Sequence, residues 1–544
     1  MEKVDAAGHG DHISPVSIAL LIWILAESLA AAPIVNAETR VGSLVLNPGE
    51  GTLISSVIDP TKGFAYFAPT EQSPAVIVRV RLSDFTRVGA LTLNPGEGAT
   101  LESAVIDTVN GFAYFGTGTG PGIVVKIRLS DFTRVGAIIL SSIENENVLS
   151  SAVIDVPNGF AYFGTNSGKV AKIRLSDFSR VGSISAGPDM IALNSAVIDT
   201  DAGFAYFASS MASPGKIAKI RLSDFTLVGT LTLNPEEFRS SIRCAVIDTA
   251  NGFAYFGTHT GGIPARPTIV VKVRLSDFTE VGSLTLMSGV TGLFSGVIDT
   301  ENGFAYFGSL VDVASVKPGK IVKIRLSDFT EVESLTLDQN EVDARCSVID
   351  TVKGFAYFGF NFKPGIVVKV DLSTFTTTTA TGTGIATFRA DKGTLVNLVA
   401  VPESNLPSVG RPSMGFPHGF FSFTVSRVSS GATVTVTITL PSSLPADVQW
   451  WKIHGGTWSR LPASKVSSNG NLVTLTLTDG ASPDDDDGAA NSVIVDAGGP
   501  GVPGPSGPVS GVLVPVNKLA ILAPYLTLIG LVATVATTLK KRRN

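Results

Sequence analysis

The chain has 544 residues, 56 of them glycine; 44% of its residues are hydrophobic and only 16% are charged. This length allows two or three domains, and the composition is typical of a β-rich secreted protein. Two cysteines exclude a disulfide framework, and a net charge of −5 gives no general support for a nucleic-acid partner.

Residues 1–37 have the features of an export signal. Residues 16–25 are an apolar stretch too short to cross a membrane, and Ala37, two positions after Val35, fits the small-residue pattern of a signal-peptidase site. Acidic residues outnumber Lys3 before the apolar stretch, so an uncleaved anchor is the alternative. We predict a signal peptide over residues 1–37, and therefore export.

One motif, VID followed by GFAYF, recurs throughout residues 38–376. Its acidic residue is found at Asp59, Asp107, Asp155, Asp199, Asp248, Asp299 and Asp350. Successive positions are 44 (Asp155 to Asp199) to 51 (Asp248 to Asp299) residues apart, a period typical of propeller blades. Each repeat holds four short stretches rich in Val, Ile, Phe and Tyr, separated by turn residues. The pattern predicts a β-propeller with seven four-stranded blades.

The two ends of the repeat array predict how the ring closes. Residues 39–51, TRVGSLVLNPGEG, nearly match the fourth strand of the first repeat at residues 86–98, but no first three strands precede them. The seventh repeat runs into a threonine-rich stretch after Phe375 and lacks this fourth strand. We therefore predict that the N-terminal strand completes the last blade and removes the unpaired edges of an open array.

Two repeated positions invite a functional interpretation but favour a structural one. The Asp of each VID precedes a glycine by four residues, which is the spacing of a tight turn capped by the carboxylate; a metal or catalytic role is the alternative. Four residues before the Asp, each repeat has Ser or Cys, and Cys244 and Cys346 occupy equivalent places. Because these places are two blades apart, we expect two buried thiols and no disulfide.

The third strand of each of the first six repeats carries two basic residues at alternate positions, on one face of its sheet, and the seventh has Lys369 with Asp371. These candidate polyanion contacts are Arg79, Arg81, Lys126, Arg128, Lys172, Arg174, Lys219, Arg221, Lys272, Arg274, Lys323 and Arg325. One hypothesis is a basic belt that binds nucleic acid or an acidic polysaccharide. The favoured alternative is a ladder of ion pairs with the turn residues Asp84, Asp131, Asp177, Asp224, Asp277 and Asp328. No aromatic residues alternate with the basic ones to stack bases, so a nucleic-acid partner is not expected.

The repeats differ most in the segments between strands, at residues 141–149, 187–193, 258–268 and 309–319. Loops on a rigid β scaffold usually carry binding specificity, so these are the first place to seek a ligand. We find no catalytic constellation and no cofactor motif: His259 is the one histidine in the repeats, which is too few for a histidine metal cage.

The phrases AVIDTANGFAYFGT and VVKVRLSDFTEVGSLTL resemble the repeats of YVTN and YncE-type seven-bladed propellers, and more closely the LSDFT-type repeats of archaeal and bacterial cell-surface proteins. The resemblance covers residues 38–376. It implies a propeller fold and a surface location rather than an activity.

Residues 377–497 have a different composition and predict a small β-sandwich around Trp450, Trp451 and Trp458. The segments FPHGFFSFTVS, WWKIHGGTWSRLP and NSVIVDAGGPG resemble a choice-of-anchor domain, which precedes C-terminal attachment signals. An acidic run holds Asp484, Asp485, Asp486 and Asp487. We interpret it as a solvated acidic turn, with a calcium site as the weaker alternative because the spacing is not that of a calcium loop. The threonines of residues 376–381 are candidates for O-glycans.

The C-terminus predicts attachment to a membrane. Residues 498–518 are a Pro/Gly linker, and residues 519–539 are an uncharged stretch of about 31 Å as a helix, enough to span a hydrocarbon core of about 30 Å. The basic residues of the tail, 540–544, are then cytoplasmic. The segment resembles archaeal C-terminal anchors and, less closely, sorting signals that an enzyme cleaves.

Together these features predict an all-β chain: a seven-bladed propeller, a β-sandwich and one C-terminal transmembrane helix. The function that we expect is a non-catalytic scaffold on the cell surface, exported and anchored by its C-terminal helix, that serves in the envelope, in adhesion or in ligand binding. Its expected partners are the membrane and envelope polysaccharide or other surface proteins. The alternatives are an extracellular lyase or hydrolase acting on polysaccharide, which requires charged groups to converge at one mouth of the central channel, and a polyanion-binding module that uses the basic belt.

Overall fold

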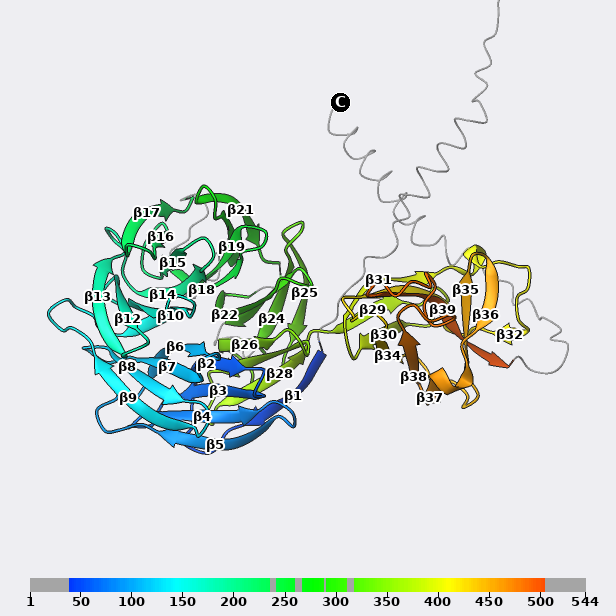
Figure 1. Ribbon diagram of the computed structural model, residues 1–544, viewed down its shortest axis with the longest axis horizontal. Helices are drawn as coiled ribbons and strands as arrows, with labels where there is room; N and C mark the ends of the chain where they lie inside the picture. The colour runs from blue at the N-terminus through cyan, green and yellow to red at the C-terminus, as the bar shows by residue number, and fades with distance from the viewer. Residues whose placement is uncertain (1–38, 235–240, 260–266, 288–289, 311–317, 504–544) are drawn as a thin grey trace, which may run out of the picture.

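The computed structural model describes residues 39–234, 241–259, 267–287, 290–310 and 318–503. This part of the chain forms a β-propeller domain built from repeated four-stranded antiparallel sheets, followed by a second β domain (Figure 1). Among these residues, no helix is long and apolar enough to cross a membrane. The predicted signal peptide (1–37), the transmembrane segment (519–539) and the basic tail (540–544) all lie outside the described residues.

Each repeat folds into strands in the order of the sequence. The first contains β2 (Leu53–Asp59), β3 (Phe64–Pro69), β4 (Val76–Arg81) and β5 (Thr86–Thr92), which pair with their neighbours in that order. The later repeats contain β6 (Leu101–Asp107), β7 (Phe112–Thr117), β8 (Ile123–Arg128), β9 (Thr133–Ile139); β10 (Leu149–Asp155), β11 (Phe160–Thr165), β12 (Lys169–Arg174), β13 (Ser179–Ser185); β14 (Leu193–Asp199), β15 (Phe204–Ser209), β16 (Lys216–Arg221), β17 (Thr226–Thr232); β18 (Ser241–Asp248), β19 (Phe253–His259), β20 (Ile269–Arg274), β21 (Thr279–Thr285); β22 (Gly292–Asp299), β23 (Phe304–Leu310), β24 (Lys320–Arg325), β25 (Thr330–Thr336); and β26 (Ala344–Asp350), β27 (Phe355–Phe360), β28 (Ile366–Asp371). A single bridge between His259 and Gly292 links the sheets of β18–β21 and β22–β25.

The N-terminal strand β1 (Thr39–Val45) completes the last repeat, as the sequence predicts. It pairs antiparallel with β28, from Thr39 opposite Asp371 to Val45 opposite Ile366, in a sheet ordered β1-β28-β27-β26 (Figure 1). The innermost strand of this repeat, β26, packs against β2 as the other neighbouring innermost strands pack against each other. β1 therefore joins the two ends of the array, and the edge of β28 that would otherwise be unpaired is covered.

The hydrophobic core of the propeller lies between neighbouring repeats. One cluster joins Tyr66 of the first repeat to Phe115 of the second, and another joins Phe67 of the first to Tyr357 of the last. The strands of the GFAYF motif are buried on both faces, whereas the outermost strands are only partly buried. The uniform motif thus reflects one packing environment that is repeated around the axis.

The turn interpretation of the VID motif is confirmed. Lys62 N donates a hydrogen bond of 2.9 Å to Asp59 Oδ1, and Gly63 has a φ of +75°, where a side chain would be strained. The equivalent carboxylates cap their own turns in the same way at Asp107, Asp155, Asp199, Asp248, Asp299 and Asp350. Cys244 and Cys346 are free, buried thiols, and burial raises the pKa of Cys346 to about 12.

The second domain is a β-sandwich of two sheets around one core that includes Phe388, Phe423 and Trp450. One sheet is ordered β29-β30-β34-β38-β37; in the other, ordered β31-β33-β39-β35-β36, β32 also pairs with β39. The strands are β29 (Thr374–Thr378), β30 (Ile385–Ala390), β31 (Thr394–Val401), β32 (Met414–Gly415), β33 (Phe420–Ser426), β34 (Thr433–Thr439), β35 (Gln449–His454), β36 (Thr457–Arg460), β37 (Val466–Asn469), β38 (Leu472–Thr478) and β39 (Val493–Pro503), with short 3₁₀ turns η3 (Glu403–Asn405) and η4 (Ala463–Lys465).

Two predicted boundaries were wrong by a few residues. β29 begins at Thr374, so the sandwich starts before the predicted residue 377. The predicted linker of residues 498–518 starts too early, because residues 498–503 belong to β39 and pair with β35 and β32. The glycines that suggested a linker instead let β39 lie close to bulky side chains. A Cβ at Gly498, for example, would collide with the Trp450 indole. The proposed O-glycan site at Thr379 is buried, and its hydroxyl accepts a hydrogen bond from Thr383 N.

Candidate functional site

The innermost strands of the repeats enclose a narrow hollow of about 190 Å³ along the axis of the propeller. Small residues such as Ala104, Ala152 and Ala196 line its middle. The residues two positions earlier on the same strands lie nearer one mouth and vary between repeats; they include Glu102, Ser150, Asn194, Phe294 and, in two repeats, Arg243 and Arg345. A uniform channel therefore ends in a chemically varied rim.

Two arginines and a histidine gather around Phe294 at this rim. The guanidinium carbon of Arg345 lies 4.6 Å from the centre of the Phe294 ring, and that of Arg243 lies 5.5 Å from it. The His259 ring is 5.0 Å from the same ring. We call these residues, Arg243, His259, Phe294 and Arg345, the arginine mouth.

Neighbouring side chains orient both arginines. Arg345 Nε lies 2.7 Å from Asp343 Oδ2, and Asp343 is buried. Arg243 Nε donates a hydrogen bond of 3.0 Å to Ser241 Oγ. The arginines are therefore held in place rather than extended into solvent.

Two arginine charges in the arginine mouth meet one paired carboxylate, that of Asp343. Burial is the main cause that lowers the pKa of Arg243, and repulsion by Arg345 lowers it further. Burial also lowers the pKa of His259, and the positive charges of Arg243 and Arg345 add to this effect. Like charges brought together in a partly buried place favour binding of an anion, and such perturbed groups gather at functional sites. Guanidinium groups suit carboxylates in particular, because they can donate two parallel hydrogen bonds.

The predicted variable segments enter the propeller at the same end as the arginine mouth. Residues 141–149 and 187–193 lead directly into the first residues of β10 and β14, which start at that end. Residues 260–266 and 311–317 of the other two segments lie outside the described residues. The sequence analysis missed Arg243, Phe294 and Arg345, although an alignment of the repeats marks their position as the variable one before the conserved Ser or Cys.

The arginines of the predicted basic belt form ion pairs with the turn acids. Arg81 Nη2 lies 2.8 Å from Asp84 Oδ2, and its hydrogen bonds lower the pKa of Asp84 to about 2. The same pairing holds in the other repeats for Arg128, Arg174, Arg221, Arg274 and Arg325. Each of these charges is matched by a neighbour, so the ladder prediction is correct for these six arginines, though not for Arg79, and the case for a polyanion belt is weakened.

The prediction that the lysines of the belt pair with the same acids was wrong. Lys126 is buried, and its Nζ lies 4.0 Å from the ring centre of Phe112 and 5.5 Å from those of Tyr114 and Phe178. Phe178 comes from the next repeat. Equivalent cation–π contacts that also reach the next repeat are made by Arg79, Lys172, Lys219 and Lys272. Lys323 and Lys369 lie over aromatic rings of their own repeats. These groups join repeats and are not surface contacts for a polyanion.

The interpretation of residues 484–487 as a solvated acidic turn was also wrong. Asp484 and Asp485 are buried. Asp485 accepts hydrogen bonds from Gly480 N and Val495 N, and Asp484 accepts one from Thr478 N and pairs with Lys465. The oxygens that a calcium ion would need are thus engaged by N–H donors, and the described residues contain no group of three or more acidic, His or Cys side chains that could hold a metal.

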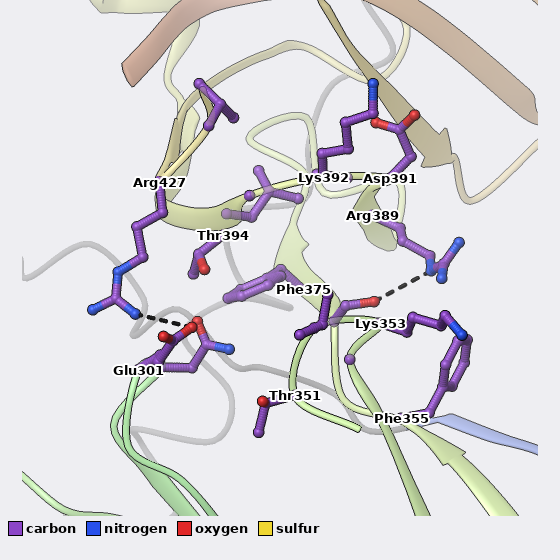
Figure 2. A pocket seen from close by; sticks show the side chains of 18 of the residues that line it. Glu301, Thr351, Lys353, Phe355, Phe375, Arg389, Asp391, Lys392, Thr394 and Arg427 are labelled. Atoms are coloured by element: carbon purple, nitrogen blue, oxygen red, sulfur yellow. Dashed lines mark hydrogen bonds and ion pairs between the residues drawn. The ribbon is translucent and has the colours of Figure 1, made fainter. Parts of the chain in front are cut away.

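A larger cleft of about 840 Å³ lies between the propeller and the sandwich. Figure 2 shows Arg427 of the sandwich reaching Glu301 of the propeller, at 3.4 Å, across this cleft. On its other side, Arg389 pairs with Asp371 at 2.9 Å. Asp371 replaces the arginine of the other repeats, so the seventh repeat exchanges its own ladder pair for one with the sandwich. The cleft carries charges of both signs, and we interpret it as the junction between the domains, at the end of the propeller opposite the arginine mouth.

Comparison with known proteins does not identify a family: no family model and no curated protein matches the chain. Among solved structures, it is similar to the hydrazine synthase of Kuenenia stuttgartiensis, with a TM-score of 0.49 and 11% sequence identity over 61% of this chain and 98% of that chain. The propeller assignment here rests on the strand pairing.

Proposed function

We propose that the chain is a seven-bladed β-propeller displayed outside the cell that binds an anionic ligand at the arginine mouth without transforming it. The observation that carries the proposal is the convergence of Arg243 and Arg345 around the exposed end of a channel whose middle is lined by small residues. The chemistry fits a carboxylate-bearing glycan, because guanidinium groups bind carboxylates and an aromatic ring such as Phe294 offers a face for a sugar.

The position of the arginine mouth supports the proposal that the propeller is displayed outside the cell. The sandwich attaches to the propeller through turns such as that of Glu301 and through the segment after β28, at the end remote from the rim. A chain anchored through its C-terminus would therefore present the rim outward. We also propose that the signal peptide, the C-terminal anchor and the relation to LSDFT-type surface proteins hold as the sequence suggests; protease treatment of intact cells should then remove the propeller while a C-terminal epitope stays with the membrane.

A second candidate function is a polysaccharide-degrading enzyme. It is favoured by Glu102, a carboxylate that lines the same hollow as the arginines and could act as a general base. The hollow of about 190 Å³ is small for several sugar units, so we favour binding of a terminal or branching residue.

The test is binding of the full chain to a uronic-acid polysaccharide, with neutral dextran as the comparison. The double variant Arg243→Met, Arg345→Met should weaken binding about 10-fold or more, because a hydrogen bond to a charged group contributes about 1.5–3 kcal/mol. The matched control is Arg81→Met, Arg128→Met, which removes two arginines of the ladder and should leave binding unchanged. Loss of binding in the control instead would support the polyanion belt, and shortening of the polysaccharide during incubation would support the enzyme.

A further inference from the structure

The β-sandwich buries one lysine against two carboxyl groups. Lys452 and Asp496 are both 0% exposed. Lys452 Nζ lies 2.9 Å from Asp496 Oδ2 and 3.0 Å from Asp486 Oδ1. It also donates hydrogen bonds to the carbonyl oxygens of Pro483, at 2.7 Å, and Asp484, at 2.8 Å. These contacts bring a fully buried amine together with one fully buried acid and one acid, Asp486, whose side chain is 11% exposed.

The sheet fixes the two partners relative to each other. β35 and β39 are neighbours, and Lys452 is opposite Gly498 in their register. Asp496 is two residues before Gly498, so it points to the same face of the sheet as a diagonal neighbour of Lys452. The fully buried Trp450 holds the carboxyl group from the other side, because its Nε1 donates a hydrogen bond of 3.2 Å to Asp496 Oδ1.

Charge in this cluster is unbalanced. One ammonium faces two carboxyl groups in a low-dielectric interior, where an uncompensated negative charge is costly. Burial raises the pKa of Asp486 and raises that of Asp496 to about 6. The neutral cluster therefore keeps one proton on a carboxyl group, which is the electrophile that amide formation requires.

We propose that Lys452 Nζ and Asp496 Cγ form an intramolecular amide bond autocatalytically, with Asp486 as the catalytic proton-transfer residue. Asp486 takes one proton from the ammonium, and the free amine attacks Cγ of the protonated Asp496. A C–N bond forms and the C–OH bond breaks. The hydroxyl group leaves as water after Asp486 returns its proton, and Asp486 takes the second proton lost by nitrogen. No oxidant or reductant is needed.

The structure offers an exit for the products. A hollow of about 330 Å³ is lined by Asp486, His454 and Pro483. The side chain of Asp486 is 11% exposed, whereas that of Lys452 is 0% exposed. Asp486 thus contacts both the buried amine and the hollow, through which water and the last proton can reach solvent.

The bond would join the last described strand to its neighbour. β39 ends at Pro503 and leads into residues 504–544, where the sequence predicts the anchor. A covalent link from β39 to β35 would prevent this strand from peeling away when the C-terminus is pulled. It would also remove the buried charges. The proposal does not depend on ligand binding by the arginine mouth.

The decisive measurement is mass spectrometry of the full chain after denaturation and proteolysis. We expect one branched peptide that contains both Lys452 and Asp496 and is lighter by one water molecule than the two linear peptides together. Trypsin should not cleave after Lys452. Recovery of Lys452 and Asp496 in separate, unmodified peptides would show an ion pair only and overturn the proposal.

Variants separate the chemistry from the fold. Asp486→Asn should slow formation of the branched peptide about 10²-fold or more, the usual contribution of acid–base catalysis. Asp496→Ala should abolish it, whereas Asp496→Asn should restore the same product by releasing ammonia. The control is Lys465→Met, which removes the partner of Asp484 and should leave the branched peptide unchanged. An Asp486→Asn chain that forms the bond at the wild-type rate would overturn the role of Asp486.

Discussion

The propeller and the sandwich stabilise charged groups in opposite ways. In the propeller, the same contacts recur: an Arg–Asp pair beside the third strand in six repeats and, between neighbouring repeats, a cation over an aromatic ring. In the sandwich, one buried lysine faces two carboxyl groups at a single place. We therefore expect the propeller to tolerate the loss of one such contact and the sandwich to depend on its single cluster.

A carboxylate beside the outer strand recurs in the repeats, although different residues supply it. Arg87 pairs with the buried Glu50, and the same pair recurs as Arg134 with Glu97, Arg180 with Glu146 and Arg40 with Glu341. In two other repeats the outer strand carries Glu280 or Glu331 instead, and each accepts a hydrogen bond from a loop amide, Asn234 N or Met287 N. Glu50 performs this second role itself by accepting from Asn47 N. A carboxylate is therefore present in each case, supplied by a loop in four repeats and by the outer strand in the other two.

The largest expected effect comes from removing β1, the strand that completes the last repeat from the other end of the chain. Deletion of residues 39–45 should cost more than about 5 kcal/mol, comparable to the whole stability of a domain, because β28 loses its partner and Glu341 loses Arg40. Size-exclusion chromatography and denaturant unfolding should show aggregation and early unfolding of the propeller. The control is Val41→Ala, Val45→Ala, which changes two exposed side chains and keeps the strand. A deletion that stays monomeric with unchanged unfolding would contradict closure by β1.

The next effect should come from one inter-repeat contact. Phe178→Ala should cost about 2–3 kcal/mol, because the ring packs between Tyr114 and Lys126 of the preceding repeat. Phe178 has a φ of +49°, so Phe178→Gly should cost less than Phe178→Ala by about 1 kcal/mol. Thermal unfolding measures both. The usual order, with Gly worse than Ala, would show that the left-handed backbone is not maintained in solution.

The sequence predicted what is periodic and missed what depends on contacts between distant segments. The strands, the turns of the VID motif and the pairing of β1 follow from local patterns that recur. The destination of Lys126 could not be predicted, because Phe178 belongs to another repeat. Lys452 and Asp496 were missed for the same reason: nothing in the order of the sandwich strands tells that β35 lies beside β39. Arg243 and Arg345 could have been found, since their position varies in an otherwise uniform motif.

Acid should distinguish the two domains. The hydrogen bonds from Arg81 lower the pKa of Asp84 to about 2, and the pKa values of Asp131 and Asp177 are lowered as well. A carboxylate whose pKa is lower in the folded state than in the unfolded state stabilises the fold above the unfolded pKa. Propeller stability should therefore fall as the pH decreases from about 4 to about 2.

The sandwich should behave differently over a higher range of pH. Without an amide bond, the raised pKa of Asp496, about 6, means that stability is full below the unfolded pKa and is lost as the pH rises through about 6. With the amide bond, Asp496 no longer titrates. We expect the unfolding temperature of the sandwich, measured by calorimetry, to fall only slightly between about pH 4 and 7, because Asp486 is then the one carboxyl group of the cluster that still titrates. A steep decrease over that interval would indicate that Asp496 is free.

The smallest effect should come from a single rung of the ladder. Arg81→Gln removes one exposed ion pair and should leave the free energy of unfolding almost unchanged, because solvent screens both partners and the other repeats keep their own pairs. Added salt should reduce even this difference. A matched change at a buried pair, Arg180→Gln, leaves Glu146 without its guanidinium in a site where it is 0% exposed, and should cost several times more. Chemical denaturation of the two variants, side by side, measures the ratio. Equal losses of unfolding free energy would mean that the exposed ion pairs stabilise the propeller as much as the buried ones do. The exposed pairs of the repeats would then not be dispensable one by one.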